Sequence, residues 1–323
     1  MHRLCALLPL ALLVACSGTD GGSARPDPAP SESEVEVAPH ADVGFGPVGV
    51  TTADDGSVWV VAARDETVSR IPTGAEAPDL TVDVPGVPLR ATSAYGAIWV
   101  TSFHGKKLLR IDPATGQVTA AIRTGAGPEG VAAGFGSVWL VAQDAGKLLR
   151  IDPDTDTVDA AIDLDVGARL VAAGPDAMYV AHYANDAVLR IDPDTNEVTS
   201  SGEVCDGPQA MAVLAATVWV TCTLSDELVA LDATTLQPVA KVAVEGSPDS
   251  VAATPDGRLA VVAEEGPTLV MVDPGSATVV GQTVLGAERA LGDRANLDLA
   301  LAGGEAWVSS FNADRVYHVP LPG

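Results

Sequence analysis

The tryptophans of this 323-residue chain recur at a fixed interval, and this interval restricts the possible folds more than any other feature. The column contains Trp59, Trp99, Trp139, Tyr179, Trp219, Leu259 and Trp307. Its members are forty residues apart until the last step, which is forty-eight residues long. A period near forty indicates one supersecondary unit repeated along the chain, here seven times.

Each unit contains four short runs of β-forming residues separated by turn residues. In the third unit the runs are 131–133, 137–142, 147–151 and 157–164. Runs of this length between Gly, Asp and Pro favour strands over helices, and the repeated Asp-Pro-x-Thr string is typical of turns. Four strands per forty residues predict an all-β fold, a seven-bladed β-propeller. A parallel β-helix also repeats, but its coils are shorter.

The two ends of the repeat region predict how the ring closes. We expect the propeller to span residues 34–323. The last unit stops soon after its third run, and an alternating Glu-Val-Glu-Val string at 34–37 precedes the first unit. We therefore expect this N-terminal strand to close the last blade as its outer strand, which leaves no long strand edge unpaired. The eight extra residues of the last unit, near 285–295, predict a partial lid or a tolerated loop insertion.

The first 33 residues have the composition of a processed and tethered N-terminus. Residues 1–15 contain an apolar run too short for a permanent membrane span, and we interpret them as a signal peptide. They lead into Leu13-Val-Ala-Cys16, which resembles the lipobox of bacterial lipoproteins. The resemblance implies lipidation of Cys16 and attachment to the bacterial cell envelope, on a periplasmic face, an outer-membrane face or the cell surface. An ordinary secretory signal followed by a chance Cys is the alternative.

Two further features bear on partners. Residues 16–33 are rich in Ser, Gly, Asp and Pro, which predicts a disordered acidic tether. The formal net charge of −25 repels nucleic-acid phosphates and anionic lipid headgroups. We therefore expect no nucleic-acid partner, and contact with the membrane through a lipid anchor only. We also expect a monomer.

The sequence carries no motif that names a reaction or a cofactor. It has no Gly-rich phosphate loop, no nucleophile–base motif and no His or Cys spacing typical of a metal site. We therefore expect no cofactor and no metal.

Aromatic and polar side chains gather on one predicted face of the ring. The loops between second and third strands and the loops between blades share a face of a propeller, which we call the loop face. The side chains predicted there are Phe45, Phe103, His104, His182, Tyr183, Asn185, Phe311 and Asn312. The starts of the first strands add Arg90, Glu129, Arg169, Gln209 and Asp249. Such a rim is typical of a site for a small ligand or a partner peptide. Alternatively the rings cap the core between blades, and the His residues form structural hydrogen bonds.

Two side-chain sets remain. Cys205 and Cys222 fall on the loop face of one blade, which in an exported protein predicts a disulfide, with two buried free thiols as the alternative. Arginines recur at 70, 110, 150 and 190. We expect them to pair with acids of neighbouring blades, although a functional ring of arginines is the other interpretation.

The strings Trp99-Val-Thr-Ser102 and Arg110-Ile-Asp-Pro-Ala-Thr-Gly116 resemble the YVTN-type and NHL-like repeat propellers of bacterial envelopes and the virginiamycin B lyase-like group. The resemblance covers about residues 43–323. It implies a propeller scaffold that binds an envelope protein or a small ligand, or alternatively a lyase or lactonase-type hydrolase acting on the loop face. The lyase pattern has a Glu three residues after the strand aromatic, and no unit of this chain has one there. We therefore expect binding rather than catalysis.

Overall fold

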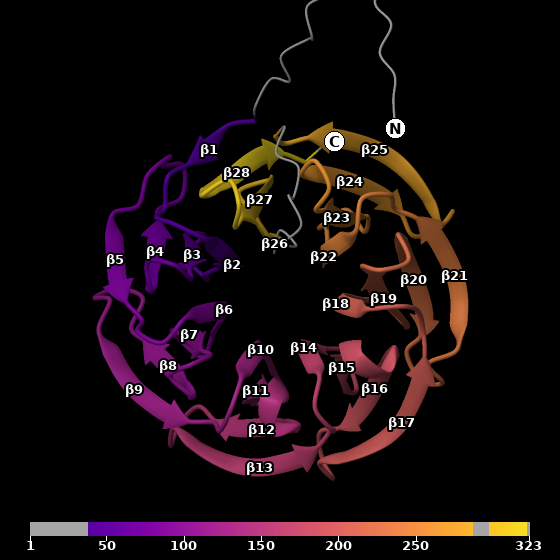
Figure 1. Ribbon diagram of the computed structural model, residues 1–323, viewed down its shortest axis with the longest axis horizontal. Helices are drawn as coiled ribbons and strands as arrows, with labels where there is room; N and C mark the ends of the chain where they lie inside the picture. Colours follow the sequence, from indigo (N-terminus) through magenta and orange to yellow (C-terminus); the bar gives the residue numbers. More distant parts are fainter. Residues whose placement is uncertain (1–37, 287–296, 322–323) are drawn as a thin grey trace, which may run out of the picture. The chain divides into compact units, whose positions relative to one another are not determined.

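The computed structural model describes residues 38–286 and 297–321. Within them the chain forms seven four-stranded antiparallel sheets, arranged as blades around an axis (Figure 1). The first strand of each blade lies nearest the axis and the fourth lies at the rim. In the described part, the only helical elements are the short 3-10 helices η1 (Gln143–Ala145) and η2 (Tyr183–Asn185). The predicted seven-bladed, all-β propeller is confirmed.

The strands follow the chain blade by blade. Blades 1 and 2 comprise β2 (Pro47–Thr52), β3 (Val58–Ala62), β4 (Thr67–Ile71), β5 (Leu80–Asp83), β6 (Pro88–Ala94), β7 (Ala97–Ser102), β8 (Lys107–Ile111) and β9 (Val118–Arg123). Blades 3 and 4 comprise β10 (Pro128–Gly134), β11 (Ser137–Ala142), β12 (Lys147–Asp152), β13 (Thr157–Asp163), β14 (Ala168–Ala173), β15 (Met178–His182), β16 (Ala187–Asp192) and β17 (Glu197–Glu203). Blades 5 and 6 comprise β18 (Pro208–Leu214), β19 (Thr217–Cys222), β20 (Glu227–Asp232), β21 (Pro238–Ala243), β22 (Pro248–Ala253), β23 (Leu259–Ala263), β24 (Thr268–Asp273) and β25 (Thr278–Val284). Blade 7 comprises β26 (Leu297–Ala302), β27 (Glu305–Ser310), β28 (Arg315–Pro320) and, as its outer strand, β1 (His40–Ala41).

An N-terminal strand closes the last blade, as predicted. β1 pairs antiparallel with β28, placing His40 opposite Tyr317 and Ala41 opposite Val316. The backbone N–H of His318 also donates to the carbonyl of Pro39 (2.9 Å). The described closing strand is thus two residues long and begins at His40. Residues 34–37, to which the alternating pattern assigned this strand, lie outside the described residues.

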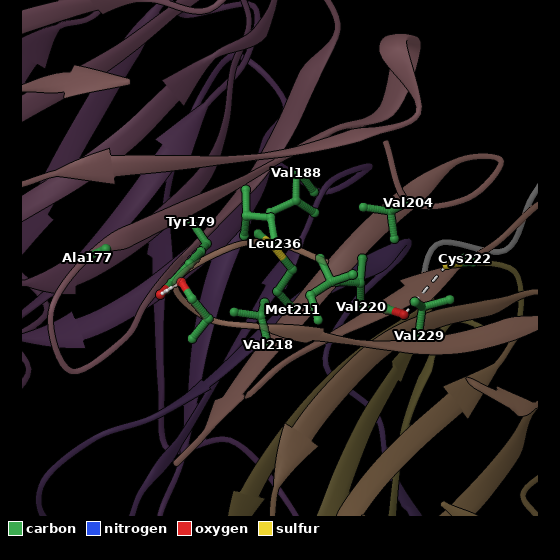
Figure 2. Close-up of a cluster of buried hydrophobic side chains, with 13 residues drawn as sticks. Ala177, Tyr179, Val188, Val204, Met211, Val218, Val220, Cys222, Val229 and Leu236 are labelled. Atoms are coloured by element: carbon green, nitrogen blue, oxygen red, sulfur yellow. Dashed lines mark hydrogen bonds between the residues drawn. The ribbon is translucent and has the colours of Figure 1, made fainter. Parts of the chain in front are cut away.

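The apolar core lies between consecutive blades. Trp139 of blade 3 packs against Met178 and Val180 of blade 4. Tyr179 of blade 4 packs in turn with Val218 of blade 5 (Figure 2). Each aromatic of the forty-residue column therefore belongs to an interface between blades, where large rings exclude water from both sheets.

Three of the recurrent arginines join their blade to the next one. Their Nη1 groups donate to the carbonyl of a Pro in the following blade, at distances of 2.8 Å for Arg70 to Pro113, 3.0 Å for Arg110 to Pro153 and 2.6 Å for Arg150 to Pro193. We call this contact the arginine clasp. The expected partner in the next blade is thus mainly a carbonyl, because the Asp-Pro turn presents that oxygen to the guanidinium. Arg110 also contacts a carboxylate of the next blade, that of Asp156 (3.1 Å).

At the junction between blades 4 and 5 a tyrosine hydroxyl replaces the clasp. Arg190 bonds within its own blade, to Asp176 and Thr199 (both 3.1 Å). The hydroxyl of Tyr179 donates to the carbonyl of Ala233 (2.8 Å), which occupies the Pro position of blade 5. Tyr179 therefore has two roles: its ring packs between the blades, and its hydroxyl supplies the inter-blade hydrogen bond.

Candidate ligand-binding site on the loop face

The first strands bring polar side chains of different blades together at the axis. Arg169 of blade 4 donates to Gln209 of blade 5 (2.8 Å), and its Nε lies 3.8 Å from the carboxylate of Glu129 in blade 3. Arg90 of blade 2 donates through Nη1 to the carbonyl of Val48 in blade 1. Residues near 90, 130, 170 and 210 thus meet because all first strands converge on one axis (Figure 1).

A second set of contacts continues around the axis through blades 6, 7 and 1. Asp249 accepts from the backbone N–H of Leu297 (2.7 Å). Asp298 accepts from the hydroxyl of Ser250 (3.1 Å) and from the backbone N–H of Val50 (3.0 Å). Carboxylates of the last two blades therefore tie the ring together where the chain begins and ends.

Two adjoining cavities open between the first blades on this face. The inner cavity, of about 160 Å³, is lined by Val48, Leu89, Arg90, Phe103, Glu129, Gln143 and Arg169. The outer cavity, of about 410 Å³, is lined by Val48, Ala63, Arg64, Glu66, Val87, Leu89 and Phe311. Val48 and Leu89 line both, so the two cavities meet at these side chains.

The inner cavity has buried polar atoms without a partner among the described residues. The Nε of Arg90 and the Oε1 of Gln143 are buried and make no hydrogen bond to any described residue. Arg90 as a whole is only 7% exposed. Unpaired buried donors and acceptors are uncommon, and each one calls for an explanation such as a ligand or an ordered water.

Electrostatics in the cavity are set by burial. Burial raises the pKa of the Glu129 carboxyl, while Arg169 and Arg90 act in the opposite direction. The burial contribution is the larger because the carboxyl has lost its water and no described donor lies within hydrogen-bond distance of it.

A carboxyl pair lies on the far side of the axis in blade 6. Asp249 and Glu264 are 3% and 4% exposed. Burial and mutual repulsion raise the pKa of Glu264, and burial also raises that of Asp249. Each of the two carboxyls is among the groups that shift the pKa of the other, so they titrate as a pair. Two buried carboxyls this close cannot both ionise easily, so the pair retains one proton near neutral pH.

Sequence reasoning missed two residues of this region, Glu264 and Gln143. Both directly follow a fully buried second strand, β23 and β11. A polar residue at that junction was the available signal, but it also describes most loop residues.

Several predicted site residues do lie at the cavities. Arg90, Arg169 and Phe103 line the inner cavity, and Phe311 lines the outer one. The guanidinium of Arg64 covers the Phe311 ring at 4.2 Å from its centroid. The guanidinium of Arg169 covers Tyr183 in the same way at 4.5 Å, so Tyr183 supports Arg169 from behind.

The other predicted residues lie away from the cavity walls. His104 is exposed and meets Phe103 edge to face, with ring centroids 5.5 Å apart. His182 is 1% exposed, and its Nε2 lies 2.8 Å from the carbonyl of Leu164. The described residues that line the two cavities, Val48, Ala63, Arg64, Glu66, Val87, Leu89, Arg90, Phe103, Glu129, Gln143, Arg169 and Phe311, include no histidine.

Three more predicted residues are exposed. Phe45, Asn185 and Asn312 all lie on loop-face segments, and Phe45 is 60% exposed. The amide of Asn185 lies 3.4 Å from His182 Nε2. Neither cavity wall includes these three side chains.

Cys205 and Cys222 are joined by a disulfide in the structure, with Cα atoms 5.9 Å apart. The bond links the segment before β18 to the end of β19, and Cys222 is fully buried. In the described ranges, no group of three or more His, Cys, Asp and Glu side chains is placed to hold a metal ion. Residues 38–286 and 297–321 also contain no helix with the length and hydropathy of a membrane span. Most of the segment expected as a lid or insertion, 287–295, and the lipidation residue Cys16 lie outside the described residues.

Several solved structures of known proteins have the same fold. A structure of streptogramin B lyase superposes with a TM-score of 0.72 at 15% identity, covering 86% of this chain and 95% of that one. A catalytically inactive variant of virginiamycin B lyase from Staphylococcus aureus, solved with quinupristin, gives 0.74 at 15% identity, covering 88% and 98%. BamB from Moraxella catarrhalis gives 0.59 at 14% identity, covering 85% and 83%.

These structural similarities are too low in identity to show more than a shared fold. No curated protein matches the chain by sequence. The family model of the virginiamycin B lyase family, however, matches residues 33–201, more than half of the chain. The chain belongs to the virginiamycin B lyase family.

Proposed function

We propose that this protein is a lipid-anchored binding protein of the bacterial cell envelope, whose loop face holds a small ligand or a segment of a partner protein. The observation that carries the proposal is the inner cavity with two buried atoms, Arg90 Nε and Gln143 Oε1, that have no partner in the described part of the chain. A donor and an acceptor in one concave site are what a ligand with complementary groups requires.

The free-energy cost of burying charged side chains at the axis supports a binding role. The core between blades is apolar and stabilises the ring, and neither Arg90 nor Glu129 belongs to it. Burying a charged group without full hydrogen bonding costs about several kcal/mol. Arg90 and Glu129 are both 7% exposed, and Glu129 lies 3.8 Å from its nearest guanidinium nitrogen. A pre-organised ligand site gives a use for side chains that the scaffold does not need.

Attachment to the membrane through Cys16 is the second part of the proposal. It is supported by the apolar run, the lipobox-like string and the polar tether at residues 16–33. The net charge of −25 disfavours adsorption on anionic lipids, so the anchor would be the only contact with the membrane. Expression of the full chain with Cys16→Ala in a bacterial host should move the protein from the membrane fraction to the soluble exported fraction. Retention of the variant in the membrane fraction would contradict the anchor.

The binding role is tested by a thermal-shift screen of purified protein against envelope metabolites, peptides and divalent ions. Any stabilising ligand should lose its effect in Phe103→Ala and Phe311→Ala, which shorten one wall of each cavity. Phe45→Ala serves as the matched control, since its ring lies on the same face but lines neither cavity. A ligand that stabilises wild type and both cavity variants equally would place binding elsewhere.

A lyase activity is the second candidate, and one observation favours it besides family membership. The Asp249 and Glu264 pair holds a proton that could be given to a leaving group, and a carboxylate that could accept one. Incubation with quinupristin, the compound present in the related Staphylococcus structure, followed by chromatography with mass detection tests this directly. Conversion that is lost in Glu264→Gln would establish the enzyme. Binding of quinupristin without conversion would support the binding role.

A further inference from the structure

We propose that the two adjoining cavities bind the carboxylate end of an N-acylated amino acid, with the carboxylate and its neighbouring N–H in the inner cavity and an apolar group in the outer one. This inference rests on the proposed function and specifies the ligand chemistry of the same site.

Arg90 is the carboxylate-binding group. One arm of its guanidinium, Nη1, is already bonded to the Val48 carbonyl, which fixes the plane of the group. Its Nε has no described partner. The edge formed by Nε and Nη2 therefore remains for a ligand, and this edge has the spacing that a carboxylate takes with two parallel hydrogen bonds.

The charge of the inner cavity fits a single anion. Among the side chains that line it, Arg90 and Arg169 are the cations and Glu129 is the carboxyl. The buried carboxyls of blade 6 also act on these arginines, Asp249 on Arg90 and Glu264 on Arg169. A phosphate dianion would place a second negative charge beside these carboxyls. A monovalent carboxylate satisfies the arginine with less repulsion.

Gln143 supplies the second recognition element. Its Oε1 is a buried acceptor with no partner among the described residues, and an N–H of the ligand would satisfy it. An acylated amino acid carries an N–H one carbon away from its carboxylate, close enough for both groups to occupy one cavity of about 160 Å³. A simple fatty acid has no such donor and would leave Gln143 unpaired.

Apolar side chains continue from this polar end. Phe103 belongs to the inner cavity, while Leu89 and Val48 form the wall shared with the outer cavity. Val87 and Phe311 extend the apolar wall beyond them. Arg64 and Glu66 are the charged side chains of the outer cavity, and its other lining residues are apolar, so an acyl chain or an apolar side chain would lose water from its surface there.

Two sources supply this chemistry: the C-terminal residue of a peptide and a fatty-acylated amino acid. N-decanoyl-L-leucine and the dipeptide N-acetyl-L-phenylalanyl-L-leucine represent them as probes. Isothermal titration of each acid, and of the corresponding leucinamide without the charge, measures the contribution of the carboxylate. We expect at least one acid to bind, with the matching amide at least tenfold weaker. The acid that binds more tightly identifies the source.

Variants assign the groups. Arg90→Lys keeps the charge and removes the two-donor edge, and Gln143→Leu removes the acceptor at similar size. Each should weaken the acid at least tenfold. Gln117→Leu, an exposed Gln on the opposite face, is the control and should leave affinity unchanged. Circular dichroism checks that each variant folds, and if Arg90→Lys does not fold, Gln143→Leu tests the site alone.

The outcomes separate this inference from the function on which it rests. Equal binding of acid and amide, unchanged affinity in Gln143→Leu, or no binding of either acid overturns the carboxylate inference. The binding role fails on different data, namely when no compound of the broad screen binds in a manner that depends on Phe103 or Phe311.

Discussion

The arginine clasp makes a quantitative prediction about how the ring is held together. Arg150→Met keeps the length of the side chain but removes three hydrogen bonds, to Pro193 (2.6 Å), Asn196 (3.2 Å) and Ser137 (2.9 Å). A hydrogen bond from a charged donor contributes about 1.5–3 kcal/mol when buried, and less where solvent reaches it. Since Arg150 is partly exposed, we expect a loss of about 2–3 kcal/mol in the free energy of unfolding.

Arg190→Met is the matched control for this loss. Arg190 occupies the same column, but its two hydrogen bonds stay within blade 4, and Asp176, one of its partners, is largely exposed. We expect its replacement to cost less than about 1 kcal/mol. Thermal and urea denaturation followed by circular dichroism measure both variants. With an unfolding entropy of about 2 cal/mol/K per residue, the Arg150 variant should melt about 4 °C below wild type. Equal losses of unfolding free energy in the two variants would refute the idea that the inter-blade hydrogen bonds of Arg150 stabilise the ring.

Three further predictions address other parts of the ring. The double variant Cys205→Ala, Cys222→Ala should lower the free energy of unfolding by about 3 kcal/mol, because the disulfide closes a loop with a sequence separation of 17. Reducing agent should lower the melting temperature of the wild type and leave that of the double variant unchanged. Gly130→Ala should lower the free energy of unfolding by about 1–3 kcal/mol in urea denaturation, because the new Cβ would lie 2.7 Å from the Cα of Leu170 in the neighbouring first strand. Gly136→Ala is the control: its Cβ would contact nothing, although the residue has a positive φ of 70°. A larger loss in Gly136→Ala than in Gly130→Ala would contradict the importance of the contact with Leu170. The pKa of Glu264 is raised in the folded protein, so above the ordinary glutamate pKa of 4.5 the folded protein keeps a proton that the unfolded chain releases. The free energy of unfolding should therefore fall as the pH rises above 4.5, and Glu264→Gln should flatten this decline. An unchanged pH profile of the melting temperature in Glu264→Gln would argue against the retained proton.

The repeat made the scaffold predictable from the sequence. Each blade carries the same apolar second strand and the same turn, so one well-defined unit, residues 127–153, specifies the arrangement of the others. The turn chemistry explains why: the carboxylate of Asp152 accepts the backbone N–H of Asp154 (2.7 Å), and the same bond recurs at Asp112, Asp192, Asp232 and Asp273. Local chemistry repeated in this way is visible in a single chain.

The site was less predictable, because only some of its contacts join residues that the repeat relates. The Arg169 to Glu129 and Arg169 to Gln209 contacts connect equivalent positions of neighbouring blades, and a column of polar residues pointed to them. The pairing of Asp249 with Glu264 connects different columns within blade 6, and no periodic signal marks it. His182 shows the converse, since its place on the loop face suggested function while its ring is directed to the Leu164 carbonyl.

The two kinds of contact between blades divide the molecule into a part that repeats and a part that does not. Clasps and aromatic clusters lie along the second and third strands: the column aromatic recurs in six of the seven units and the clasp arginine in three. The first strands are different: the equivalent positions hold Val48, Leu89, Glu129, Arg169, Gln209, Asp249 and Asp298, with few neighbours alike. Because the clasps and the aromatic clusters lie away from the axis, first-strand residues can vary in charge while these contacts persist. Since buried charges lower stability unless they are paired, a site of this kind is retained most readily when something binds it.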